Sequence, residues 1–277
     1  MNKSLTPNWP FLKMHGLGND FVILDWRKTA LDLPPALITG LADRHRGVGF
    51  DQLAVIESGT GDAHLRFFNA DGSVSEACGN ATRCIARYLM DELEKSSLHL
   101  TTDRGALRAE TSPDGSVAIN MGQPLLTWQD IPLSEAMETL VLPIKGDPSA
   151  TGMGNPHCTF FVPDIAAINL EADAAPIEHH PLFPERTNVQ FAQVIGKDHI
   201  RMRVWERGVG VTLASGSSSC ATAVAAARRG LTGRSVKIDV DGGSLQIDWR
   251  EDGVWLTGPT MHVFSGRLTR QFLDSLR

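Results

Sequence analysis

The chain has 277 residues, of which 42% are hydrophobic and 21% charged, and its formal net charge is −6. These values are typical of a soluble globular protein with two domains or lobes. A negative charge without a Lys/Arg cluster argues against nucleic-acid binding, and no apolar run approaches the ~20 residues that a membrane span needs.

The N-terminus and the number of cysteines help to predict the cellular compartment. The first residues, MNKSLTPNWPFLKMHG, contain no apolar core of a secretory signal. Four cysteines are too few for a disulfide framework in a chain of this length. We therefore expect a cytoplasmic protein with reduced thiols, in which Cys84, Cys158 and Cys220 serve as packing residues.

The first half of the chain shows strand signals on both sides of one helix. Residues 16–24 (GLGNDFVIL) and 65–69 (LRFFN) read as strands, and residues 79–94 read as a helix. Three runs of alternating apolar and polar residues follow, separated by turns that contain glycine, at 97–103, 106–112 and 116–122. This alternation predicts an antiparallel meander.

The second half repeats these signals in the same order. Residues 152–162 (GMGNPHCTFFV) match 16–24, and residues 214–223 (ASGSSSCATA) match 77–86 (ACGNATRCIA). A helix is expected over 216–230, followed by alternating runs at 235–241, 244–251 and 253–258. In the first half 59 residues separate Asn19 from Cys78, and in the second half 60 separate Asn155 from Ser215. Matches in one order and at equal spacing indicate a duplicated unit.

The duplication predicts an α+β fold of two pseudo-symmetric lobes, each an antiparallel sheet wrapped around a central helix. The expected lobes are residues 1–122, which carry Cys78, and 123–277, which carry Ser215; residues 262–277 can return to the N-terminal lobe. Equivalent residues of two such lobes are expected to face a ligand from opposite sides. That arrangement suits the inversion of a stereocentre, because one proton leaves one face and another arrives at the opposite face.

Cys78 is the first candidate for chemistry, because it lies between a strand and the start of a helix. The positive end of the helix dipole and the unpaired N–H groups favour a thiolate at that position. The same N–H groups can hold a substrate carboxylate. A lone cysteine is more often a small buried hydrophobe, but the setting beside Gly79 and Asn80 favours the functional interpretation.

Ser215 takes the equivalent place in the second half, within RVWERGVGVTLASGSSSCATA (203–223). A strand carrying Glu206 and Arg207 and a glycine-rich turn precede it. Ser218 and Ser219, at the start of the following helix, are interpreted as helix-capping residues.

Six segments taken in order are similar to the signature segments of the diaminopimelate epimerase family: HGLGNDF, RGVGFDQL, FFNADGSVSEACGNATRC, GNPHC, ERTNVQF and ERGVGVTLASG. The resemblance covers essentially the whole chain. It implies two pseudo-symmetric lobes, no pyridoxal phosphate and no metal, and a homodimer. It also implies interconversion of LL- and meso-diaminopimelate, a reaction that supplies lysine and peptidoglycan synthesis.

The resemblance also assigns roles by position. Cys78 matches one catalytic cysteine, Ser215 stands in the place of the other, and His157 and Glu206 match the acid/base partners that tune the two thiols. The substrate-binding positions fall on ten further residues: Asn19, Gln52, Asn69, Gly79, Asn80, Asn155, Asn188, Arg207, Gly216 and Ser217.

Plain structural explanations stay open for several of these residues. His157 also fits a core histidine, although its GNPH context favours function, and Glu206 with Arg207 also fits a solvated ion pair worth under ~1 kcal/mol. The asparagines suit turns, and Gln52 suits a strand end at the surface.

The chain departs from the family at two positions, Val211, where glutamate is usual, and Ser215. Because a hydroxyl is a far weaker acid than a thiol of pKa ~8.5, Ser215 is expected to impair a mechanism that needs one thiolate and one thiol. A natural divergence and a deliberate inactivating substitution both fit this residue. Three other functions also fit the sequence: a dehydratase of β-hydroxy amino acids, a racemase of another amino acid, and a non-catalytic amino-acid binder.

Overall fold

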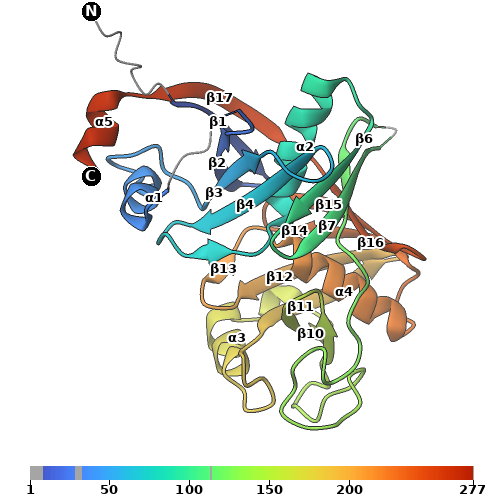
Figure 1. Cartoon of the computed structure of the whole chain (residues 1–277). Coiled ribbons are helices and arrows are strands. Elements are labelled where there is room, and N and C mark those ends of the chain that lie inside the picture. Colours follow the sequence, from blue (N-terminus) through green and yellow to red (C-terminus); the bar gives the residue numbers. More distant parts are fainter. Residues whose placement is uncertain (1–8, 29–32, 113, 277) are drawn as a thin grey trace, which may run out of the picture. The chain divides into compact units, whose positions relative to one another are not determined.

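The computed structural model describes residues 9–28, 33–112 and 114–276. The chain forms two compact units (Figure 1), of which unit 1 comprises Met1–Val117 with Pro259–Arg277 and unit 2 comprises Ala118–Gly258. The division into lobes 1–122 and 123–277 stays a prediction. The segment searched for a secretory signal begins with residues 1–8, which lie outside the described residues.

Unit 1 is a mixed sheet with three helices. Its strands pair in the order β17–β1–β2–β3–β4, with both β5 and β6 on β4 and with β7 on β6; the β2–β3 and β4–β6 pairs are parallel and the others antiparallel. The elements are β1 (Trp9–Gly16), β2 (Asn19–Asp25), α1 (Pro35–Ala42), β3 (Gln52–Glu57), β4 (Ala63–Asn69), β5 (Val74–Ser75), α2 (Gly79–Leu93), β6 (Ser97–Thr102), β7 (Gly105–Thr111), β17 (Met261–Leu268) and α5 (Arg270–Ser275).

The pairing of strands β9 to β15 in unit 2 repeats that of β1 to β7 in unit 1, and unit 2 adds β16 and β8. Its strands pair in the order β9–β10–β11–β12, and both β13 and β14 pair with β12. Strand β15 pairs with β14, β16 with β15, and β8 with β16. The β10–β11 and β12–β14 pairs are parallel. The elements are β8 (Val117–Asn120), β9 (Ser149–Gly152), β10 (Pro156–Phe161), the 3₁₀ helix η1 (Ile165–Ala167), α3 (Leu170–Glu178), β11 (Asn188–Gly196), β12 (His199–Glu206), β13 (Gly210–Thr212), α4 (Gly216–Arg228), β14 (Ser235–Val240), β15 (Gly243–Arg250) and β16 (Gly253–Gly258).

These pairings confirm the predicted α+β fold built from a duplicated unit. Helix α4 packs against strands β9, β10, β11, β14, β15 and β16, as expected for a small-residue helix surrounded by sheet. The prediction of wholly antiparallel sheets was wrong, because each sheet contains two parallel pairs. Parallel neighbours require a crossover connection, and helices α1 and α2 lie within these connections in unit 1 as α3 and α4 do in unit 2.

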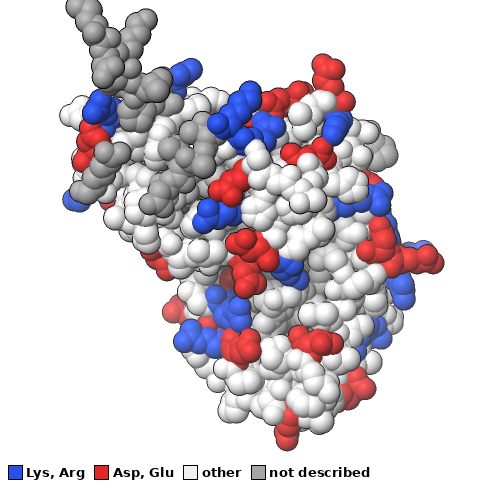
Figure 2. All heavy atoms as spheres, viewed as in Figure 1, with Lys and Arg blue, Asp and Glu red and all other residues white. Residues whose placement is uncertain are grey.

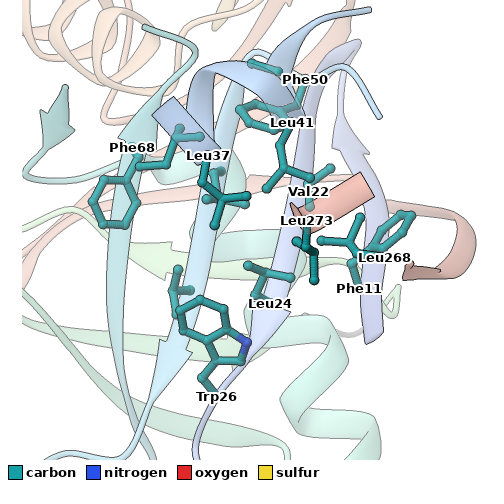
Figure 3. Close-up of a cluster of buried hydrophobic side chains, with 14 residues drawn as sticks. Phe11, Val22, Leu24, Trp26, Leu37, Leu41, Phe50, Phe68, Leu268 and Leu273 are labelled. Carbon is teal, nitrogen blue, oxygen red and sulfur yellow. The ribbon is translucent and has the colours of Figure 1, made fainter. Parts of the chain in front are cut away.

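Each unit has its own hydrophobic core. In unit 1, Leu37 and Leu41 of α1 and Leu273 of α5 lie in one cluster with Val22 and Leu24 of β2 (Figure 3). A second cluster in unit 2 gathers side chains from β10, α3 and β11. Truncating a buried leucine in such a cluster typically costs ~2–5 kcal/mol, so these cores hold the strand ends in place.

Candidate active site

Cys78 is the N-cap residue of α2 in unit 1. Its backbone is extended, at φ −146° and ψ 108°, and its Sγ accepts the N–H of Ala81 at 3.4 Å. The side chain is half-buried. The other thiol of this helix, Cys84, is buried six residues further along, and burial raises its pKa to about 12. The helix start is therefore the place in α2 where a thiolate is stabilised.

The polar residues assigned to unit 1 lie in two hydrogen-bonded pairs. Asn80 Nδ2 donates to Asn19 Oδ1 at 3.1 Å, and Gln52 Nε2 donates to Asn69 Oδ1 at 2.9 Å. Asn80 is buried, and among the described residues its Oδ1 has no hydrogen-bond partner. An unsatisfied buried acceptor costs ~1–3 kcal/mol, so a donor on a bound ligand would recover that energy.

A network of charged residues contacts the side chain of Asn19 through Asp51. Asp51 Oδ2 accepts from Asn19 Nδ2 at 2.9 Å, and Arg44 contacts both Asp51 and Asp20 at 2.7 Å. Burial alone would raise the pKa of Asp20, but hydrogen bonds from Arg44 and Lys13 outweigh it and lower the pKa to about 2. Asp20 is therefore ionised near neutral pH and fixes Arg44, which in turn orients Asp51.

Ser215 is the N-cap residue of α4 in unit 2, and its dihedral angles, φ −134° and ψ 120°, are similar to those of Cys78. Its side chain does not cap the helix; instead its Oγ donates to Glu206 Oε2 at 2.8 Å. The other oxygen of Glu206 accepts from Thr212 Oγ1 at 2.6 Å. Two hydroxyl donors thus hold the Glu206 carboxylate beside the helix start.

His157 is fully buried on β10, and its Nε2 lies 2.8 Å from Asn155 Oδ1. Asn188 is also buried, and its side chain bonds the backbone, with Nδ2 donating to Pro156 O at 2.9 Å and Oδ1 accepting from Arg207 N at 3.0 Å. Asn188 therefore joins the start of β10 to the turn after β12, while the side chain of Arg207 is exposed.

The duplicated fold gives most of these residues an equivalent in the other unit. Strand register pairs Phe21 with Gln52 in unit 1 and His157 with Asn188 in unit 2. Counting back nine residues from Cys78 and from Ser215 reaches Asn69 and Glu206. The amide positions are thus retained in both units, whereas the titratable His157 and Glu206 occur in unit 2 and are replaced by Phe21 and Asn69 in unit 1.

Sequence reasoning missed several residues around these side chains. Ser218 and Ser219 do not cap α4 as predicted: Ser219 Oγ donates to Ser215 O at 2.9 Å, and Ser218 Oγ lies 3.0 Å from Gln190 Nε2. Thr212 carried no recognisable signal, because isolated polar residues on strands usually face solvent. The apolar residues on both sides of Gln190 in TNVQFAQV were the one sign that this strand is buried on both faces.

Within residues 9–28, 33–112 and 114–276, no group of three or more His, Cys, Asp or Glu side chains could hold a metal ion. In the same ranges no helix is long and apolar enough to cross a bilayer. Acidic and basic side chains are interspersed on the face seen in Figure 2.

Solved structures with the same fold belong to several proteins of low sequence identity. A *Bacillus anthracis* phenazine biosynthesis protein of the PhzF family has a TM-score of 0.67 at 14% identity, covering 94% of this chain and 99% of that one. A hydroxyproline epimerase of *Agrobacterium vitis*, with bound trans-4-OH-L-proline, has a TM-score of 0.66 at 14% identity, covering 96% and 93%. These likenesses establish the fold alone.

Sequence comparison is more specific. The sequence model of the family described as diaminopimelate epimerase matches residues 11–127 and 149–263. Proteins named diaminopimelate epimerase are 50% identical over 271 residues in Rhodospirillum centenum, covering 95% of this chain and 93% of that protein, and 51% identical over 271 residues in Acidiphilium cryptum, covering 95% and 98%. A protein of that name in Acinetobacter baumannii is 44% identical over 276 residues, covering 95% and 98%. The chain therefore belongs to the diaminopimelate epimerase family.

Proposed function

We propose that this chain is a cofactor-independent epimerase that interconverts LL- and meso-diaminopimelate, with a rate limited by Ser215. Inversion at Cα needs one group to remove a proton and a second to supply one to the opposite face. Cys78 is the first group, and Ser215 stands where the second is required. The observation that carries the proposal is the matched pair of helix starts, in which Cys78 and Ser215 are N-cap residues with nearly the same backbone conformation.

The helix starts also supply the groups that bind the reacting carboxylate. The backbone N–H groups at Gly79 and Asn80 and at Gly216 and Ser217 belong to the first turns of α2 and α4. Such N–H groups and the helix dipole favour an anion and stabilise the charge that grows as the Cα proton leaves. The remaining site residues bind the substrate's distal ammonium and carboxylate: Asn19, Gln52, Asn69, Asn155, Asn188 and Arg207.

The acid/base partners act on the two reacting groups. Glu206 Oε2 accepts a hydrogen bond from the Ser215 hydroxyl at 2.8 Å and would accept one from a thiol in the same way. Family position assigns the second partner to His157, whose Nε2 lies 2.8 Å from Asn155 Oδ1. With serine at 215, substrate binding is retained and turnover is slow, because an alkoxide is too unstable to form readily near neutral pH.

Calorimetry tests the substrate assignment without requiring turnover. Diaminopimelate should bind more tightly than lysine or glutamate, because lysine lacks the distal carboxylate and glutamate lacks the distal amino group. Equal affinities for the three amino acids would contradict the assignment and favour a racemase or a binder of another amino acid.

The Ser215 hydroxyl favours a dehydratase as the second candidate, because one thiolate and one proton donor suffice to eliminate water from a β-hydroxy amino acid. A panel of such acids incubated with the protein would distinguish the two. Release of a keto acid would favour the dehydratase, whereas diaminopimelate epimerisation without keto acid would favour the epimerase.

We also propose that the chain forms a homodimer through β17 and works in the cytoplasm. Strand β17 pairs with β1 and exposes three large apolar side chains, Met261, Val263 and Phe264. An exposed apolar edge strand is a surface that proteins usually cover. Analytical ultracentrifugation should find a dimer that F264R converts to a monomer, whereas I195R, which changes another exposed apolar residue, should leave it intact. A dimer unchanged by F264R would exclude β17 as the interface.

A further inference from the structure

Next to His157 lies a group of polar side chains that have no role in the proposed reaction. Thr159, Gln190 and Ser218 are, like His157, 0% exposed. Thr159 lies two residues beyond His157 on β10, Gln190 is its register partner on β11, and Ser218 is the third residue of α4, which packs against both strands. Four fully buried polar side chains therefore meet between a helix and a sheet.

Their hydrogen bonds converge on one nitrogen of His157. Thr159 Oγ1 donates to Gln190 Oε1 at 3.0 Å, which leaves Gln190 Nε2 to donate to His157 Nδ1 at 3.1 Å and to Ser218 Oγ at 3.0 Å. Ser218 Oγ itself lies 3.5 Å from His157 Nδ1. An amide nitrogen only donates, so Nδ1 acts as an acceptor and carries no proton. The ring proton is then on Nε2, which lies 2.8 Å from Asn155 Oδ1.

The equivalent positions of unit 1, where there is no histidine, contain apolar residues. The register pair equivalent to Thr159 and Gln190 is Ile23 and Ala54, and the third residue of α2 is Ala81. Phe21 takes the place of His157. These four equivalents, Phe21, Ile23, Ala54 and Ala81, are all 0% exposed and apolar.

The comparison separates function from folding. The same helix-on-sheet contact is made by apolar packing in unit 1, so the fold does not require polar side chains at this position. Burying polar groups is unfavourable unless every one is hydrogen-bonded. A polar set at all four positions of unit 2, with its hydrogen bonds directed at Nδ1, therefore has a purpose beyond stability.

We infer that Thr159, Gln190 and Ser218 are positioning residues that hold His157 as the neutral tautomer with its proton on Nε2. That proton in turn fixes the amide of Asn155, with Oδ1 toward the histidine and Nδ2 available as a donor to an anionic ligand group. The second part rests on the proposed function, because it takes Asn155 as a substrate-binding residue.

Nitrogen NMR of the ¹⁵N-histidine-labelled protein tests the tautomer directly. His157 is identified by the resonances that H157Q removes. In the unaltered protein His157 should give one pyrrole-type Nε2 and one pyridine-type Nδ1. In Q190A, and in T159I/Q190A/S218A, which installs the apolar side chains of unit 1, the two nitrogens should show a mixture of tautomers. An Nδ1–H tautomer in the unaltered protein, or the same single tautomer in the variants, would overturn the inference.

Two further measurements exclude a merely structural role and isolate the part that depends on substrate. The variant H157F/T159I/Q190A/S218A, which replaces every member of the set by its unit 1 equivalent, should keep its thermal midpoint. The triple variant should stay folded but lose some stability, because the buried His157 Nδ1 is left without a donor. Diaminopimelate should bind about tenfold more weakly to the triple variant, the cost of roughly one hydrogen bond to a charged group. A tautomer mixture with unchanged affinity would refute the role of Asn155 and leave the tautomer inference standing; no binding by either protein would refute the proposed function alone.

Discussion

Replacing the Ser215 hydroxyl by a thiol should raise the epimerase rate by about 10²–10⁴-fold, the range that one positioned acid/base group supplies. This corresponds to ~3–5 kcal/mol of activation free energy. The position is already shaped for a thiol, because Cys78 adopts the same extended N-cap backbone in unit 1. The hydroxyl already points at Glu206, 2.8 Å away, so Ser215→Cys places a thiol beside its acceptor.

The assay is the conversion of LL- to meso-diaminopimelate, followed by chiral chromatography. Ser219→Cys is the matched control, because Ser219 is a buried hydroxyl on the same helix that bonds Ser215 O. It adds a thiol of equal size away from the N-cap. If Ser215→Cys is folded, binds diaminopimelate and turns over no faster than Ser219→Cys, then position 215 does not supply the missing acid/base group.

Three more outcomes are expected. In D₂O the protein should place deuterium at Cα of one diaminopimelate isomer with its configuration retained. Cys78→Ser should abolish this exchange, and Cys84→Ser should preserve it. Equal exchange of both isomers would mean that Ser215 is a competent base. The folded pKa of Asp20 is about 2, lower than its ordinary value of 3.8, so its stabilising contribution is present above pH ~4 and lost as the pH falls toward 2. The urea midpoints of Asp20→Asn and of the unaltered protein should therefore differ at pH 5 and converge near pH 2. A difference that stays constant with pH would refute the lowered pKa. Chelators and carbonyl-trapping reagents should leave any activity unchanged, since the sequence contains no CxxC or HExxH spacing; activity that needs added pyridoxal phosphate would refute the mechanism.

The sequence was sufficient to predict the duplication and the two helix starts, because both depend on local signals. A small residue before glycine marks the start of α2 and of α4, and the equal spacing to Asn19 and Asn155 links the two halves. Alternation also located six strands, β6, β7, β8, β14, β15 and β16, although β8 does not join the meander expected with β6 and β7. Period-two alternation says nothing about strand partners, however, so the parallel pairs and the pairing of β8 with β16 could not be predicted.

Side-chain partners in the site were harder to predict, because they depend on which face of a buried element each residue occupies. Ser218 and Ser219 look alike as helix-start serines, yet Ser219 bonds its own helix at Ser215 O and Ser218 faces Gln190. Both serines were expected to cap the helix. Register between β10 and β11, which only the structure supplies, is what brings Gln190 beside Thr159 and reveals the network behind His157.

The surroundings of the two N-cap residues indicate which of them is suited to be the base in the resting protein. Cys78 Sγ accepts a backbone N–H, a contact that favours the thiolate. The residue at 215 instead faces Glu206, whose two oxygens accept hydrogen bonds from the hydroxyl groups of Thr212 and Ser215. A carboxylate disfavours a second anion beside it and favours a protonated neighbour that donates to it. In the proposed mechanism, therefore, Cys78 removes the Cα proton first and the residue at 215 returns one. A thiol can give up that proton and remain as a thiolate, whereas a hydroxyl would become an alkoxide beside a carboxylate. The serine therefore lies at the donor position, so the carbanion formed by Cys78 is expected to recover its proton from the face it left.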